Sequence, residues 1–264
     1  GRARLSLHGC GHTGVLLIGE GFQLFGFAAL ELRDLVVQAK ENAALLLAKN
    51  GEVSLSAVEL VRQGGPGQPP ALSIVGADQL SISHCAITDS TQAVVMTVQG
   101  VSGDCQIVHN RFSGIVNFYG DAPGVLNDDQ LRRLRGLQNA IRLEPNSSHL
   151  TFIGNTLSML TVGKNILDTL ANQSARGLFA SATLEGNTFL EQRSVFVAGL
   201  LAFSHNSLLA TPTNGITPYG VLIANRATAT GNLATVLGDQ AVLQFVTAAN
   251  GGFVKAANQV LILP

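Results

Sequence analysis

The sequence predicts an all-β protein built from stacked coils, a β-solenoid, on two observations. The first is composition: of 264 residues, 46% are hydrophobic and only 12% are charged. That requires a sizeable buried core and disfavours a helical bundle, which needs more charged surface. The second is a short template that recurs along the chain at steps of about 19 to 27 residues, the length of one solenoid coil. We therefore expect one domain over residues 1–264.

The template reads apolar, any residue, Gly or His, Asn, any residue, apolar. Its clearest copies are residues 107–112, 152–157, 184–189, 203–208 and 229–234. Stacked asparagines can hydrogen-bond along the stack axis, so we expect an Asn ladder that an apolar column continues toward the N-terminus. The full column is Cys10, Leu35, Val58, Cys85, Asn110, Asn155, Asn187, Asn206, Asn232 and Asn258.

The residue just before the column predicts a left-handed bend in nearly every coil. Glycine dominates there, and Asp and His are among the other types that tolerate positive φ. His84 and His109 fall on adjacent coils, but a metal site would need further ligands that the column does not offer, so no metal is expected. The bend residues are Gly9, Asp34, Ala57, His84, His109, Gly154, Gly186, His205, Gly231 and Ala257.

The recurrent Gly-Asn-Thr-Phe type motif, as in residues 186–189, and its Asn column resemble those of the pectate-lyase-like superfamily of parallel β-helix proteins. The resemblance covers nearly the whole chain. It implies a right-handed single-stranded parallel β-helix of about ten coils, and right-handed crossovers are the rule between parallel strands. It also implies an extracellular or cell-surface location. The superfamily includes saccharide lyases, hydrolases, phage tailspikes and adhesins, so the fold does not select an activity.

One polar cluster is the candidate ligand-binding site. Strands expected at residues 114–119, 140–144 and 165–170 alternate in and out, and their outward side chains would gather on one sheet face. Carboxylates beside an Arg and a Tyr are suited to acid/base work on a sugar or to binding its hydroxyls; a solvated ion-pair cluster is the alternative. The candidate residues are Asn117, Tyr119, Asp121, Arg142, Glu144 and Asp168.

The long step from Asn110 to Asn155 contains an insertion at about residues 121–138. Asn127 can cap a short helix there, and Leu131, Leu134 and Leu137 repeat at helical spacing. We expect one inserted amphipathic helix that packs against the solenoid beside the polar cluster, either as a wall of a cleft or as an insertion without a role.

The three cysteines, Cys10, Cys85 and Cys105, occupy inward template positions and are expected to be buried thiols. The template already runs at Leu5 and Leu7, and the last residues are apolar. Uncovered solenoid ends expose unpaired strand edges, so we expect self-association or a flanking domain at the ends, with the chain forming part of a longer protein.

Two function classes remain. The favoured one is a non-catalytic β-helix scaffold or binding module for a polysaccharide or a partner protein; the alternative is a polysaccharide lyase or glycoside hydrolase. The sequence lacks the residues typical of either enzyme. It has neither the closely spaced aspartates of polygalacturonases nor the acidic calcium site of pectate lyases. The net charge of −1 provides no basic surface for a nucleic acid, so no nucleic-acid partner is expected. The sequence has no apolar run long enough to cross a membrane, so no membrane insertion is expected. No cofactor is expected.

Overall fold

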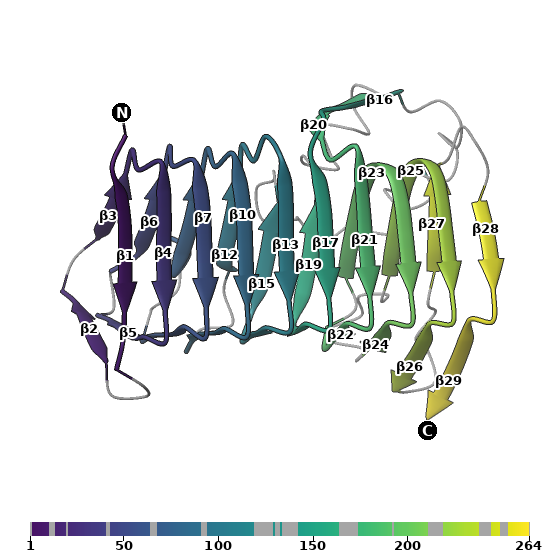
Figure 1. The fold of residues 1–264 in the computed structure, drawn as a ribbon. Coiled ribbons are helices and arrows are strands. Elements are labelled where there is room, and N and C mark those ends of the chain that lie inside the picture. Colours follow the sequence, from purple (N-terminus) through teal and green to yellow (C-terminus); the bar gives the residue numbers. More distant parts are fainter. Residues whose placement is uncertain are drawn as a thin grey trace.

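The fold is all-β, with long stacks of parallel strands (Figure 1). The computed structural model describes residues 2–10, 14–19, 21–40, 43–63, 68–90, 94–118, 129, 133, 142–163, 174–191, 193–210, 219–237, 244–248 and 253–263.

A 17-stranded sheet contains two of the stacks. We call the stack that precedes the asparagines the first stack. Its strands are β1 (Arg4–His8), β4 (Ala29–Arg33), β7 (Glu52–Ser56), β10 (Gln79–Ser83), β13 (Asp104–Val108), β17 (His149–Ile153), β21 (Ser181–Glu185), the second halves of β23 (Arg193–Ser204) and β25 (Tyr219–Thr230), and β28 (Phe253–Ala256).

The second stack lies in the same sheet because β23 and β25 run through both stacks. It holds β3 (Phe22–Phe25), β6 (Leu45–Ala48), β9 (Leu72–Val75), β12 (Val94–Gln99), β15 (Ile115–Phe118), β19 (Met159–Val162), the first halves of β23 and β25, and β27 (Gln244–Ala248).

The third stack is a separate ten-stranded sheet. It holds β2 (Val15–Ile18), β5 (Val36–Ala39), β8 (Glu59–Arg62), β11 (Ala86–Asp89), β14 (Arg111–Phe112), β18 (Thr156–Leu157), β22 (Thr188–Phe189), β24 (Ser207–Ala210), β26 (Leu233–Leu237) and β29 (Gln259–Leu263). The chain visits the first, third and second stacks in turn, which is consistent with a parallel β-helix.

The core lies between the stacks and repeats from coil to coil. Alternation along each strand points every second side chain inward, and parallel register places like positions side by side. In the first stack, Leu55, Ile82, Ile107 and Phe152 are consecutive register partners and all are buried. The apolar composition is therefore used to fill one continuous interior.

The asparagine column, Asn110, Asn155, Asn187, Asn206, Asn232 and Asn258, forms the expected hydrogen bonds. Each Oδ1 after the first accepts bonds of 2.8–3.2 Å from the backbone N–H and the Nδ2 of the asparagine one coil earlier. Each Nδ2 also donates to a backbone carbonyl, as Asn187 does to Phe152 at 2.8 Å. Polar side chains are thus buried at low cost because their amides are paired.

Toward the N-terminus, the thiol of Cys85 continues the acceptor role of the asparagines. The backbone N–H of Cys85 donates to Asn110 Oδ1 at 2.8 Å, and that of Val58 donates to Cys85 Sγ at 3.5 Å. Burial raises the pKa of Cys85 to about 11, so it remains a thiol. Cys105 is also buried, and burial raises its pKa as well. Cys10, however, is exposed, so the prediction that it is buried is wrong.

The left-handed bend before the column is confirmed in nine coils, from Asp34 to Ala257, with φ between 51° and 64°; Gly9 is not among the positive-φ residues. At Gly154 a side chain is also excluded by space. A Cβ there would lie 2.3 Å from Nδ1 of His109, whose ring comes from the preceding coil. The rings of His84 and His109 have centroids 5.6 Å apart. Among the described residues, no group of three or more His, Cys, Asp or Glu could hold a metal ion.

The inserted helix stays a prediction. Of residues 121–138, only Asp129 and Arg133 are described, both in helical conformation, and the remainder lies outside the described residues. No helix in the described part of the chain has the length and apolar character needed to cross a membrane.

Candidate functional site

Of the candidate residues that the structure describes, Asn117 lies apart from Arg142 and Glu144. Tyr119, Asp121 and Asp168 lie outside the described residues. Asn117 is on β15 in the second stack, whereas Arg142 is on β16 (Arg142–Pro145). Glu144 lies on the same short strand as Arg142.

Asn117 alternates with the core residues of β15, as expected for an outward side chain, but it is buried, with 1% of its surface exposed. It lies in a polar row of the second stack whose register partners are Ser73, Thr97, Asn117 and Thr161. Thr97 Oγ1 donates to Ser73 Oγ at 3.2 Å. Asn117 Oδ1 and Thr161 Oγ1 are buried and have no hydrogen-bond partner among the described residues.

Arg142 and Glu144 belong to a different small sheet. Strand β16 pairs with β20 (Ser174–Leu178), whereas β15 pairs with β12 and β19, and Figure 1 shows β16 and β20 beyond the ends of the stacked strands. Arg142 Nε lies 3.4 Å from Glu144 Oε1, and the Arg142 side chain is 79% exposed. Exposed pairs of this kind contribute little to stability, and the structure does not place this pair beside Asn117 on one sheet.

A polar groove lies instead on the outer face of the first stack. It crosses β7, β10 and β13 and has a volume of about 220 Å³. Two rows of outward side chains line it: an outer row of acid, amide and acid, and an inner row of two hydroxyls and an amide. The rows are Glu52, Gln79 and Asp104, then Ser54, Ser81 and Gln106.

The inner row continues along the same stack beyond the groove. The next register partners of Gln106 are Thr151 and then Thr183, so small hydroxyl side chains repeat from coil to coil. Adjacent strands are about 4.8 Å apart, which gives a rigid, evenly spaced polar face. This face combines hydroxyls, amides and carboxylates, which together both donate and accept hydrogen bonds.

The groove is acidic. Glu52 and Asp104 line it, and no basic side chain does so among the described lining residues. Asp78 lies at the adjoining turn, where its Oδ1 accepts a hydrogen bond of 3.3 Å from Ser102 Oγ.

The sequence contained a signal for this groove. Each of residues 52–54, 79–81 and 104–106 reads polar, apolar, polar, and each begins a strand shortly before a column residue. Extending the template backwards by that alternation would have placed the polar residues on one outer face. The expected site, by contrast, lies on the strands between the template copies.

Comparison with known protein families, curated proteins and solved structures found no match. A function can therefore be inferred only from the chemistry of this chain.

Proposed function

We propose that the protein is a non-catalytic, right-handed parallel β-helix of about ten coils, related to the pectate-lyase-like superfamily, that binds an extended glycan. The polar groove on β7, β10 and β13 is the observation that carries this proposal. The proposal places the glycan along the stack, across successive strands.

The groove is suited to a saccharide because of its mixed donors and acceptors. Carboxylates and hydroxyls accept hydrogen bonds from sugar hydroxyls, while amides and hydroxyls donate to them. The two rows come from strands held in register by hydrogen bonding, for example Ser54 to Ser81 and Ser81 to Gln106. A preformed surface of this kind loses little conformational freedom when a ligand binds.

A carbohydrate-active enzyme is the second candidate. Glu52 and Asp104 lie on strands separated by β10, which places their backbones roughly 9.6 Å apart. Carboxyl pairs of inverting glycosidases are about 6.5–9.5 Å apart. Both side chains are exposed, however, whereas a general acid usually has its pKa raised by burial, so binding is the better-supported function.

The test is a glycan array probed with three forms of the protein. We expect wild type to bind a defined glycan class and the double variant Gln79→Ala/Gln106→Ala to bind it at least about tenfold more weakly, a loss of about 1.4 kcal/mol. Gln99→Ala removes an exposed amide from β12 in the second stack and serves as the matched control, with unchanged binding.

Equal binding by the double variant and wild type, or no glycan binding at all, would contradict the proposal. Incubating wild type with a panel of polyuronates and neutral polysaccharides, while following unsaturated-product absorbance and reducing ends, separates the two candidates. Turnover that requires Glu52 or Asp104 would favour the enzyme.

A further inference from the structure

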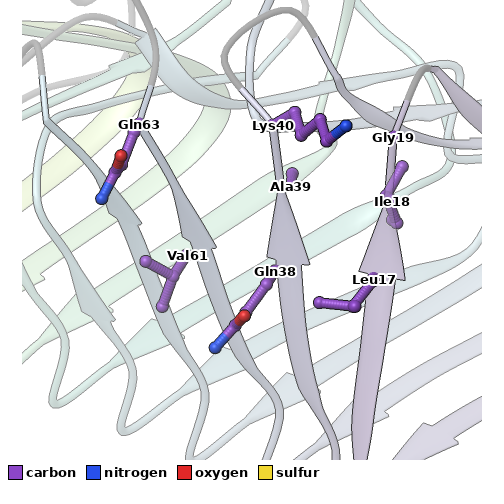
Figure 2. Close-up of a pocket in the computed structure, with 8 residues that line it drawn as sticks. All are labelled: Leu17, Ile18, Gly19, Gln38, Ala39, Lys40, Val61 and Gln63. Carbon is purple, nitrogen blue, oxygen red and sulfur yellow. The ribbon is translucent and has the colours of Figure 1, made fainter.

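A second concave site lies at the N-terminal end of the third stack, away from the polar groove. It has a volume of about 830 Å³ and is lined by Leu17, Ile18, Gly19, Gln38, Ala39, Lys40, Val61 and Gln63 (Figure 2). Pockets that bind small molecules are typically about 300–1,000 Å³. The volume is therefore sufficient for a ligand of ordinary small-molecule size.

Two apolar side chains, Leu17 and Val61, line this pocket on either side of Gln38. Leu17, Gln38 and Val61 are register partners on β2, β5 and β8, and Figure 2 shows them along neighbouring strands. Leu17 is 72% exposed, the largest exposed fraction among the large hydrophobic side chains in the described part of the chain. An apolar side chain so exposed gains free energy when a ligand covers it.

The polar side chains of the pocket are one ammonium group, that of Lys40, and two carboxamides, those of Gln38 and Gln63. Figure 2 places Lys40 and Gln63 where the chain leaves β5 and β8, and the Lys40 side chain extends toward Gly19. The backbone of Lys40 is held by a hydrogen bond of 3.0 Å from its N–H to the Ile18 carbonyl. Lys40 is the one charged residue among the described residues that line the pocket. The Lys40 ammonium can donate a charge-assisted hydrogen bond to a carboxylate, whereas Figure 2 shows the carboxamides of Gln38 and Gln63 extending away from it.

We propose that this pocket binds an amphipathic carboxylate, a molecule with an unbranched apolar chain and one carboxylate head group. The apolar chain covers Leu17 and Val61, and the head group lies at the ammonium of Lys40. This site goes beyond the glycan-binding function and does not depend on it.

Calorimetric titration with decanoate, below its micelle concentration, tests the proposal. We expect decanoate to bind saturably and about tenfold more tightly than decanol. Decylamine should bind more weakly than decanol. Shortening the acid to octanoate should weaken binding by up to about fifteenfold, because it removes two methylenes from a covered apolar site and each is worth about 0.8 kcal/mol.

Two variants separate the roles of the head group and the chain. Lys40→Ala should remove the preference for decanoate over decanol while leaving decanol binding unchanged. Leu17→Ala should weaken the binding of decanoate and of decanol by similar factors. Both residues are exposed, so the thermal transition should not move. Lys255→Ala, at the other end of the molecule on β28, is the matched control.

The proposal is wrong if decanoate gives no saturable heat, or if it binds no tighter than decanol. It is also wrong if the Lys40→Ala and Leu17→Ala variants titrate like wild type. Glycan binding by the polar groove can fail or succeed without changing any of these results.

Discussion

Replacing Asp89 by Ala should lower the free energy of unfolding by about 3–5 kcal/mol, because it leaves a buried charge without its partner. Asp89 ends β11 and Arg62 ends β8, and both side chains are completely buried. Arg62 Nε donates to Asp89 Oδ2 at 2.9 Å, Nη2 donates to the same oxygen, and Nη1 donates to the Ala43 carbonyl at 3.4 Å. The guanidinium thus connects neighbouring coils from inside the core.

Urea unfolding followed by circular dichroism measures this effect. Arg33→Ala is the control, since Arg33 forms an exposed ion pair with Asp34 and its loss should cost less than about 1 kcal/mol. The double variant Arg62→Met/Asp89→Leu should recover most of the loss, because a buried ion pair replaced by apolar side chains of similar volume is often neutral. A single Asp89→Ala variant as stable as Arg33→Ala would refute the assigned role of the pair.

Asn187→Ala should also be strongly destabilising, by about 3 kcal/mol, because it leaves several buried groups unpaired at once. Asn187 Oδ1 accepts from the N–H and the Nδ2 of Asn155 at 2.9 and 3.2 Å. Its own Nδ2 donates to the Phe152 carbonyl and to Asn206 Oδ1 at 2.8 and 3.0 Å.

The same unfolding measurement applies, with Asn258→Ala as the comparison. Asn258 is the last member of the asparagine column and only partly buried, so its loss should cost clearly less. Any glycan binding should survive in the Asn187→Ala variant at temperatures where it remains folded. Equal stability of the Asn187→Ala and Asn258→Ala variants would show that the column does not stabilise the interior.

The repeat was predictable from sequence because the same position in every coil has the same conformational and hydrogen-bonding requirement. Stacked asparagines must pair with one another, and the residue before each of them must adopt a left-handed conformation, so both columns are visible as residue types. Arg62 and Asp89 were missed although alternation along β8 and β11 puts them on the same side as Leu60 and Ile87. A charged residue at a strand end is usually solvated, and the buried partner of Arg62 lies 27 residues away in the sequence.

The candidate site was less predictable because alternation tells which face a side chain occupies but not what covers that face. Asn117 occupies the outer side of β15 as expected, yet it is buried. Arg142 and Glu144 were assigned to the stack that contains Asn117, but β16 pairs only with β20. Spacing along the chain cannot distinguish a strand that continues a stack from one that leaves it.

A crystal structure of the protein soaked with the best-bound oligosaccharide tests the central claim most directly. We expect sugar density over β7, β10 and β13, with hydroxyls within hydrogen-bond distance of the outer row, Glu52, Gln79 and Asp104, and of Ser81 in the inner row. Density at Arg142 and Glu144 instead, or an empty groove at saccharide concentrations that saturate binding in solution, would contradict the account.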